Sequence, residues 1–441
     1  MRPDRRGRPV LKIATLTALV VGNMIGAGVF TTSGFALADL GSPGRVLAAW
    51  CVGGVLALCG ALSYGALARL LPVSGGEYTY LSHNVHPAAG FVAGWVSLLA
   101  GFTAAIAYAA LTLAAYVLPE RLGSSGPLPA LVASGVILLA AVLHGLRLSV
   151  GAHVQNAAVA LKLIALLAFA AYALLGSGGI TAWPGVIELR TAAGEAVPLS
   201  IGAFALSVMW ISFSYSGFNA AVYIAGEVPA ARARVPRALL AGTALTVLIY
   251  VVLNAVFVLL PPFDAVAGRE DVAVAAARVL GGETLVGALR VIVALALFTS
   301  VSAMIMIGPR VYARMADDGL LPRMLSFRGE TPLAAVTMQA ALAVAVVWVT
   351  GLRELLSYLG FTLSLSTALT VASLFLVARR ERARTKLPGF PWAPALFVAA
   401  TLLFAALAAR QQPAELIAAL MTIASGLALY ALARRGVSRG R

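Results

Sequence analysis

The chain has 441 residues, of which 61% are apolar and only 11% are charged, whereas about 25% of the residues in an average soluble protein are charged. The mean hydropathy of +0.94 agrees with this composition. So few charges cannot cover the surface of a soluble domain of this size. The composition therefore excludes a disordered chain, a collagen and an ordinary soluble enzyme, and indicates a polytopic membrane protein.

Twelve apolar runs are each long enough to cross about 30 Å of hydrocarbon, which takes about 20 helical residues. In chain order they are residues 13–37, 45–70, 88–118, 128–147, 154–176, 201–226, 237–261, 284–314, 333–350, 355–378, 391–409 and 414–434. Helix is the expected state of each run, because backbone polar groups in lipid must be satisfied within the segment. The sequence therefore predicts an all-α integral membrane protein with 12 transmembrane helices.

The basic residues are distributed unevenly between the two sides of these runs. With the N-terminus inside, most of the 32 Lys and Arg residues fall on inner segments, with clusters at 2–12, 232–237 and 379–386. This is the positive-inside pattern, so we expect the tails at 1–12 and 435–441 to be cytoplasmic. The net charge of +15 then reflects topology, and we expect no nucleic-acid partner. Short tails and a preference for Arg over Lys indicate the inner membrane of a prokaryote.

Two of the runs contain residues that weaken a helix. The first holds Gly-Asn-Met-Ile-Gly-Ala-Gly at 22–28, and the sixth holds Ser-Phe-Ser-Tyr-Ser-Gly at 212–217. Close helix packing would use similar small residues. However, each interrupted run opens a block of five, so the second block enters the membrane from the opposite side. This order predicts a 5+5 inverted repeat with broken helices 1 and 6, the pattern of a transporter.

Four stretches in the same order resemble motifs of amino acid permeases in the amino acid–polyamine–organocation superfamily. They are GNMIGAGVF at 22–30, PVSGGEY at 72–78, FSYSGFN at 213–219 with GEV at 226–228 and PR at 236–237, and GPR at 308–310 with MADDGLLP at 315–322. The resemblance covers about residues 10–380. It implies the leucine-transporter fold, with inverted repeats at 13–176 and 201–378, two peripheral helices at 391–434, and alternating access around a central amino acid site.

The resemblance also implies where a free amino acid would bind. The N–H groups of an unwound turn in the first helix suit a carboxylate, because they lie at the positive end of a half-helix. Unwound carbonyls of the sixth helix suit an ammonium. The substrate-binding residues expected on this basis are Ile25, Gly26, Ala27, Gly28, Phe213, Ser214, Tyr215, Ser216 and Asn219.

Individual side chains have further expected roles. Phe213 resembles the family position that packs over the substrate as a gate, although a core or lipid-facing aromatic would look the same. Tyr215 and Asn219 would line the pocket for the substrate side chain. For Tyr108 in the third run, a structural hydrogen bond to a neighbouring helix is the expectation.

Lys162 lies about ten residues into the fifth run, hence about 15 Å deep at 1.5 Å per residue. Ionisable side chains at this depth are costly and are candidates for function. The chain uses Lys at only three positions, 12, 162 and 386, and Lys, unlike Arg, can lose its proton when desolvated. The alternative is a lysine whose ammonium extends to the inner surface.

Within the resemblance, such a lysine replaces a sodium ion between helices one, five and eight, with Ser300 and Ser302 as hydroxyl neighbours. Two modes of coupling stay open for it. The lysine could carry a proton in a proton-coupled transporter, or it could act as a fixed positive charge in an amino acid exchanger. A resident ammonium argues against sodium at this place, because like charges repel.

No acidic residue falls in the expected pocket, so the sequence predicts a transporter of neutral L-amino acids rather than a protein that binds a cationic side chain. The alternatives are an exchanger of cationic amino acids or polyamines, and a sensor or channel built on the same scaffold. Glu77 and Glu227 lie near inner helix ends, where we expect each to pair with an arginine.

Several ligand and partner classes have no signal in the chain. We find no catalytic constellation, P-loop, metal-binding spacing or cofactor motif, so we expect neither enzymatic activity, nor a metal, nor a cofactor. Cys51 and Cys59 share one apolar run, and no cysteine falls on an outer segment. The resemblance includes a subset of permeases that pair with a single-span glycoprotein through a cysteine in an external loop, so without such a cysteine we expect no obligatory protein partner. The expected partners are an amino acid substrate, protons and the lipid bilayer.

Overall fold

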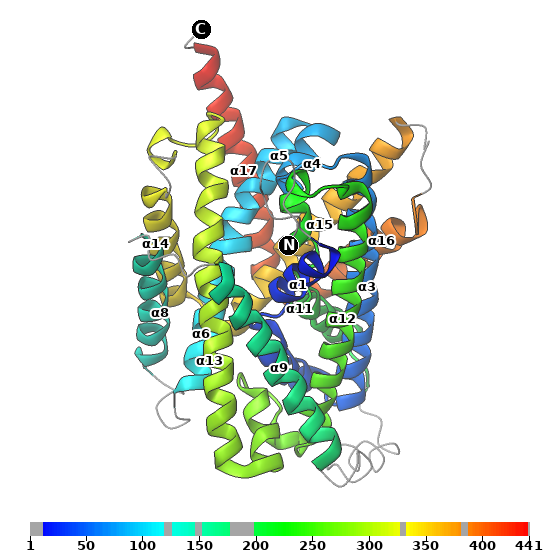
Figure 1. Ribbon diagram of the computed structural model, residues 1–441, viewed down its shortest axis with the longest axis vertical. Coiled ribbons are helices and arrows are strands. Elements are labelled where there is room, and N and C mark those ends of the chain that lie inside the picture. Colours follow the sequence, from blue (N-terminus) through cyan, green and yellow to red (C-terminus); the bar gives the residue numbers. More distant parts are fainter. Residues whose placement is uncertain are drawn as a thin grey trace.

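The computed structural model describes residues 12–118, 126–145, 152–176, 198–326, 332–380 and 387–439. The predicted N-terminal tail lies outside these residues except for Lys12, as do residues 440–441 of the C-terminal tail and the loop at 381–386. Within the described ranges every regular element is a helix (Figure 1). This agrees with the all-α prediction.

The elements follow one another with short connections. The first part of the chain forms α1 (Ile13–Met24), α2 (Gly28–Leu40), α3 (Pro43–Leu70), α4 (Gly76–Asn84), α5 (Pro87–Val96), the π-helix η1 (Ser97–Ala104), α6 (Ala105–Val117), α8 (Leu128–Gly145) and α9 (Ala152–Gly176). The second part forms α11 (Ile201–Ser214), η4 (Ala220–Glu227), α12 (Ala231–Leu259), η5 (Phe263–Ala265), α13 (Val272–Asp317), η6 (Arg323–Leu325), α14 (Leu333–Val349), α15 (Leu352–Arg380), α16 (Trp392–Ala408) and α17 (Pro413–Arg439).

Six of these helices are long and apolar enough to cross a membrane, or up to seven if the bent pair of α1 and α2 is one span. They cover Pro43–Leu70, Pro87–Val117, Ala231–Leu259, Val272–Asp317, Leu352–Arg380 and Pro413–Ala433. Four further apolar helices are shorter, at Leu128–His144, Ile201–Ser214, Leu333–Val349 and Trp392–Ala408, and a fifth apolar stretch, Ala160–Gly176, is the later part of the 25-residue α9. The protein therefore has several membrane-capable helices, fewer by length alone than the twelve predicted from hydropathy.

Local sequence explains where several helices begin and end. α2 ends at Gly41, which adopts a left-handed conformation with φ of 63°, and Pro43 opens α3. Glycine after a helix and proline at its first turn are the favoured residues at these places. The 46-residue α13 is two helices joined at a kink, because Gly281 and Gly282 leave helical geometry. The predicted eighth span begins directly after this kink.

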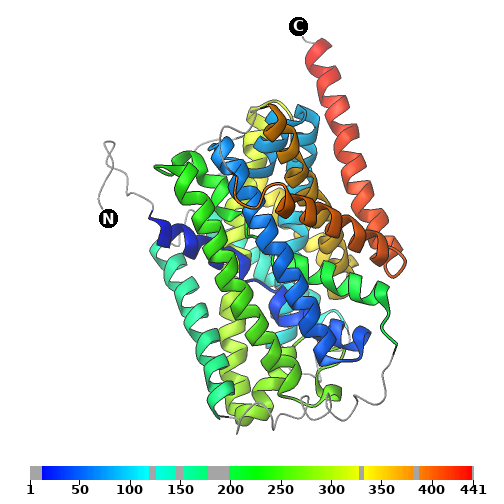
Figure 2. The ribbon, with the colours of Figure 1, turned by 90° about the vertical axis from the view of Figure 1, so that its right-hand side faces the viewer.

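The first predicted span is broken in the structure. α1 ends at Met24 and α2 begins at Gly28, and the two helices meet at an angle of 44°. Figure 2 shows α1 entering from the side of the molecule and ending in its interior. α11 likewise stops at Ser214, and after a turn the chain continues as η4. Both interruptions fall within the stretches at 22–28 and 212–217.

Small residues on α3 allow the helices around these breaks to approach closely. α3 and α12 lie side by side along the long axis (Figures 1 and 2). A Cβ atom on Gly53 would lie 2.5 Å from Ile211, and one on Gly60 would lie 2.7 Å from Phe218. Glycine at such positions lets membrane helices pack at short distance. These contacts hold α11 and its continuation against α3.

We expect Gly34→Ala to destabilise the fold. A Cβ at position 34 in α2 would lie 1.9 Å from the carbonyl oxygen of Arg269, a backbone atom that cannot simply rotate away. Overpacking of this kind costs about 1–3 kcal/mol, so Gly34→Ala should lower the Tm of the protein in detergent. Gly287→Ala in α13 is the matched control, because a Cβ there meets nothing within 4 Å. Equal Tm values for the two variants would contradict this packing.

Candidate functional site

The carbonyl groups at the end of α1 accept hydrogen bonds from side chains of two other helices. Lys162 Nζ on α9 donates to the carbonyl oxygens of Gly22, at 3.2 Å, and Ile25, at 2.7 Å. The hydroxyl of Tyr250 on α12 donates to the carbonyl of Met24 at 2.6 Å. The last carbonyls of a helix have no partner within it, and these two side chains supply one.

Lys162 is 4% exposed, while its neighbours Leu161 and Ile164 are 59% and 64% exposed. The side chain is therefore turned into the protein and away from the lipid-facing surface, which argues against an ammonium extended to the inner surface. The carbonyl end of α1 carries the negative end of the helix dipole, which stabilises a cation. In the part of the chain that is described, both hydrogen-bond acceptors of the Lys162 ammonium are backbone carbonyls.

The expected hydroxyl neighbours of Lys162 have other partners, which corrects that part of the prediction. Ser300 Oγ donates to the carbonyl of Ala296 in its own helix at 3.0 Å. Ser302 Oγ is hydrogen-bonded to His144 Nε2 of α8 at 2.8 Å. Serine hydroxyls in helices often bond to the carbonyl four residues earlier. The sequence placed these serines in the right helix but could not reveal these competing partners.

The two helix breaks contact each other. A Cβ on Gly28, the first residue of α2, would lie 2.3 Å from Ser214 Oγ at the end of α11. Gly217 in the turn after α11 has φ of 97°, and its Cβ would lie 2.8 Å from the carbonyl oxygen of Asn23. Ser214 Oγ also shares a hydrogen bond of 2.9 Å with Thr32. The structure thus brings the stretches at 22–28 and 213–217 together.

The two helix ends at this contact carry partial charges of opposite sign. α2 begins at Gly28, and the N–H of Phe30 donates to the Ala27 carbonyl at 3.0 Å. The N–H groups of its first two residues have no intrahelical carbonyl to bond and lie at the positive end of the helix dipole. α11 ends at Ser214 with carbonyls at its negative end, of which that of Phe213 accepts the Ser216 N–H at 2.8 Å. Such a pair of helix ends can hold a ligand that carries both an anion and a cation.

The aromatic residues near the breaks pack against one another. The ring of Phe213 stands edge-on to Tyr108, with centroids 5.4 Å apart, and the Tyr108 hydroxyl is hydrogen-bonded to that of Thr31. Tyr108 thus has the interhelical bond expected of it. Tyr215 is buried between Trp50 and Tyr250, and its hydroxyl donates to the Trp50 carbonyl at 3.3 Å.

A cavity of about 30 Å³ lies next to the turn after α11, between α3, α11, α15 and α16. Ser212, Tyr215, Ser216 and Thr367 line part of it. A cavity of this size has room for about one water molecule, which is much smaller than an amino acid. An amino acid could occupy this region only if the surrounding helices moved.

Asn219 and Glu77 form a pair that the sequence did not suggest. Asn219 Nδ2 donates to Glu77 Oε1 at 3.3 Å, so this amide is engaged by a carboxylate rather than free to line a pocket. Tyr64 and Thr367 donate to the same oxygen at 2.5 and 3.4 Å. The prediction of an arginine partner for Glu77 is wrong, since these three donors are all neutral.

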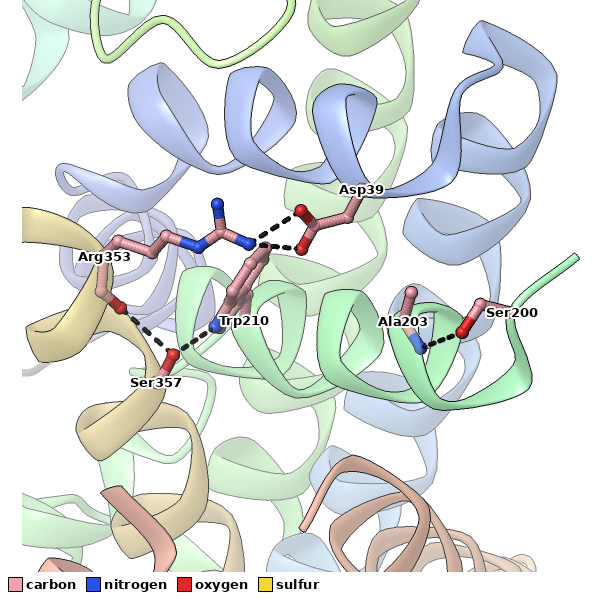
Figure 3. A network of polar contacts seen from close by, with 6 residues as sticks. All are labelled: Asp39, Ser200, Ala203, Trp210, Arg353 and Ser357. Carbon is pink, nitrogen blue, oxygen red and sulfur yellow. Dashed lines mark hydrogen bonds and ion pairs between the residues drawn. The ribbon is translucent and has the colours of Figure 1, made fainter. Parts of the chain in front are cut away.

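On the other side of α11, an ion pair connects three helices (Figure 3). Arg353 Nη2 on α15 lies 2.6 Å from both carboxylate oxygens of Asp39 on α2. Its guanidinium lies over the ring of Trp210 on α11, 5.3 Å from the centroid. Trp210 Nε1 in turn donates to Ser357 Oγ on α15 at 2.8 Å. The only sequence signal was that Asp39 and Arg353 flank predicted spans on the same side.

The comparisons with known proteins agree with this geometry. The model of the amino acid permease family matches residues 11–428. The chain is 29% identical over 375 residues to the mouse large neutral amino acids transporter small subunit 2, covering 82% of this chain and 68% of the relative. It is 30% identical to the human cystine/glutamate transporter over 81% of this chain and 71% of the relative.

The match to one bacterial relative extends over most of both chains. The serine/threonine exchanger SteT of Bacillus subtilis is 26% identical over 393 residues, which is 86% of both chains. Together with the family match, these relatives confirm the resemblance drawn from the four motifs, and they support a multi-pass membrane protein. The chain therefore belongs to the amino acid permease family.

Proposed function

We propose that the protein transports neutral L-amino acids across the membrane by alternating access, with protons coupled through Lys162. The observation that carries the proposal is the contact between the two helix breaks, Gly28 against Ser214 and Gly217 against Asn23. In this proposal the N–H groups at 26–28 bind the substrate carboxylate, and carbonyls near Phe213 bind its ammonium.

The proposal includes twelve spans in a 5+5 inverted repeat. With the bent pair counted as one span, the seven long spans and the five shorter apolar segments would together supply twelve. The bent pair of α1 and α2 would be the first broken span, and α11 with η4 the sixth. The repeats would run over 13–176 and 201–378, with α16 and α17 as peripheral helices and both termini on the cytoplasmic side of a prokaryotic membrane.

Neutral substrates suit the side chains at the breaks. The groups that meet there are hydroxyls and rings, from Thr31, Thr32, Tyr108, Phe213 and Ser214. A cationic substrate side chain would require a carboxylate to offset its desolvation. The mouse and Bacillus relatives are named for large neutral amino acids and for serine and threonine. The mouse relative is called a small subunit, so the absence of an obligatory protein partner stays a prediction.

Lys162 links proton binding to the position of α1 in this proposal. A charged ammonium ties α9 to the carbonyls of Gly22 and Ile25. Loss of its proton removes the attraction to the negative end of α1 and weakens the tie. The second candidate is exchange, in which Lys162 stays charged throughout the cycle. The name of the Bacillus relative favours it.

We expect purified protein in liposomes to exchange labelled alanine or leucine at least about tenfold faster than arginine, which corresponds to about 1.4 kcal/mol in selectivity. Counterflow with excess unlabelled substrate inside measures this without assuming any ion coupling. Liposomes without protein give the background. Uptake of arginine but of neither alanine nor leucine would overturn the neutral-substrate proposal.

Lys162→Arg and Lys162→Met separate the two modes of coupling. Arg keeps the charge but cannot release a proton, whereas Met loses both. For proton coupling, we expect Lys162→Arg to lose about tenfold in uptake driven by an inward proton gradient while retaining counterflow within about threefold. If wild-type uptake ignores the gradient and requires internal amino acid, and Lys162→Arg behaves as wild type, the exchanger is correct.

Arg353→Gln tests whether the ion pair between Arg353 and Asp39 helps to close the outer side of the transporter. The variant breaks the tie between α2 and α15 and leaves Asp39 without its cation. We expect counterflow to slow by about tenfold with KM changed much less, because a partly buried pair is lost outside the substrate site. Arg278→Gln is the control, since it breaks an exposed pair with Glu283, and such pairs contribute little. Equal rates for the two variants would exclude a role for Arg353 in closure.

A further inference from the structure

Glu77 is a buried carboxyl group whose hydrogen-bond donors in the described structure are all neutral. It is 8% exposed and lies in the first turn of α4. Tyr64 of α3, Asn219 of the turn after α11 and Thr367 of α15 all donate to the same oxygen, Oε1. Among the described residues no ion pair to Glu77 occurs. Buried carboxylates usually have a cation or a metal, so this one needs another explanation.

The titratable groups around Glu77 are phenols. They are Tyr64 from α3, Tyr80 from α4 itself and Tyr223 from η4, while α15 contributes the hydroxyl of Thr367 and no charged group. Tyr80 is fully buried, and its hydroxyl has no hydrogen-bond partner in the described structure. Glu77 is therefore surrounded by polar but uncharged side chains, and it is the only carboxyl group among them.

The loop that carries Glu77 is in contact with the segment that follows α11. If that segment moves, Glu77 must move with it or these contacts must break. Gly75 N–H donates to the Tyr223 carbonyl at 3.3 Å, and Gly226 N–H donates to Ser74 Oγ at 3.0 Å. A Cβ on Gly76 would lie 2.5 Å from the Tyr223 ring. The loop before α4 is thus packed on η4, directly after the turn that touches α1. A change in the charge of Glu77 can therefore alter the position of that turn.

Thr367 connects Glu77 with the water-sized cavity. Its hydroxyl donates to Glu77 Oε1, and the same residue lines the cavity beside Ser216. One water in that space would lie next to a hydroxyl that contacts the carboxyl group. Such a water could pass a proton to or from Glu77 through the Thr367 hydroxyl.

We infer that Glu77 binds a proton when the inner side of the transporter is closed and releases it to water when that side opens. The inference rests on the proposed alternating-access function. The proton would occupy Oε2, because Oε1 already accepts three bonds. Protonation converts charge-assisted hydrogen bonds into weaker neutral ones, which loosens the hold on Asn219 and Thr367.

The balance of forces at Glu77 supports this assignment. Burial raises the pKa of the Glu77 carboxyl, and the hydrogen bonds from Tyr64 and Thr367 lower it by a smaller amount. Opening of the inner side would hydrate the carboxyl and remove the larger effect, so its pKa would fall and the proton would leave. Closure would reverse the change. The same residue thus has a different proton affinity in the two conformations.

Glu77→Gln tests the assignment in proteoliposomes. Counterflow of labelled alanine is measured with the same pH on both sides, from acidic to alkaline, so no proton gradient contributes. The amide keeps the shape and can still accept from Tyr64. We expect the wild-type rate to change over the pH range in which Glu77 titrates. The Glu77→Gln rate should lack that transition and stay at the level of the wild type in acid, while any transition that belongs to Lys162 remains in both proteins. Glu227→Gln is the matched control, because Glu227 is an exposed carboxylate at the end of η4, and it should retain the wild-type profile.

Tyr64→Phe provides an independent test that keeps the carboxyl group. It removes the 2.5 Å donor, which favours the charged form of Glu77. We expect the pH profile to move upward by about one pH unit, a tenfold change in proton affinity. A purely structural role for this cluster would change the rate at every pH and leave the profile where it was. That result, or a wild-type profile in Glu77→Gln, would overturn the inference.

Infrared difference spectra separate this inference from the proposed function. In purified protein, the pH-dependent C=O band of a protonated carboxyl should be present in wild type and absent in Glu77→Gln. If wild-type liposomes transport no amino acid while the band behaves in this way, the proposed function fails and Glu77 remains a proton-binding group. If transport is normal and the band is the same in both proteins, only the assignment of Glu77 fails.

Discussion

The structure depends on the partners of the backbone groups freed by the break in the first span. A helix that stops inside the protein leaves carbonyls at one end and N–H groups at the next start, and unsatisfied groups of this kind are costly away from water. Lys162 and Tyr250 occupy the carbonyls of Gly22, Met24 and Ile25. The break is therefore possible because α9 and α12 bring donors to it. The N–H groups at the start of α2 are the complementary half, and the proposed function assigns them to a substrate.

This requirement determines much of the surrounding packing. The two breaks approach closely enough that only glycine fits at 28 and 217. α11 can reach this position because glycines on α3 admit Ile211 and Phe218. Trp50 on the same helix packs edge-on against both Tyr215 and Tyr250, and its Nε1 donates to Ser33 of α2. Small residues thus create the space, and aromatic residues with polar atoms fill it.

Different polar interactions stabilise the two sides of the breaks. Asp39 and Arg353 form a pair of opposite charges, reinforced by the ring of Trp210. Glu77 instead accepts from an amide and two hydroxyls, without a cation in the described structure. The protein therefore has an ion pair on one side and, on the other, a buried carboxyl group among neutral donors, to which we assign a proton.

The sequence alone determined the features that depend on composition and short-range order. Hydropathy located the apolar helices, small residues located both breaks, and depth within a span singled out Lys162, because each of these signals lies within one segment. The motifs also identified the family. Helix length was less well predicted, since the predicted spans at 333–350 and 391–409 form helices of only 17 residues.

Only the tertiary structure decided which groups meet. Lys162 lies 137 residues from Ile25, Tyr250 lies 226 residues from Met24, and Arg353 lies 314 residues from Asp39. Ser300 and Ser302 looked equally suited to Lys162, and Asn219 to a pocket, because a hydroxyl or an amide in a sequence does not reveal its partner. Glu77 looked like one of two similar glutamates, yet one is buried among phenols and the other is exposed. Hydrogen bonds form between groups that packing brings within about 3 Å, and no local pattern records that distance.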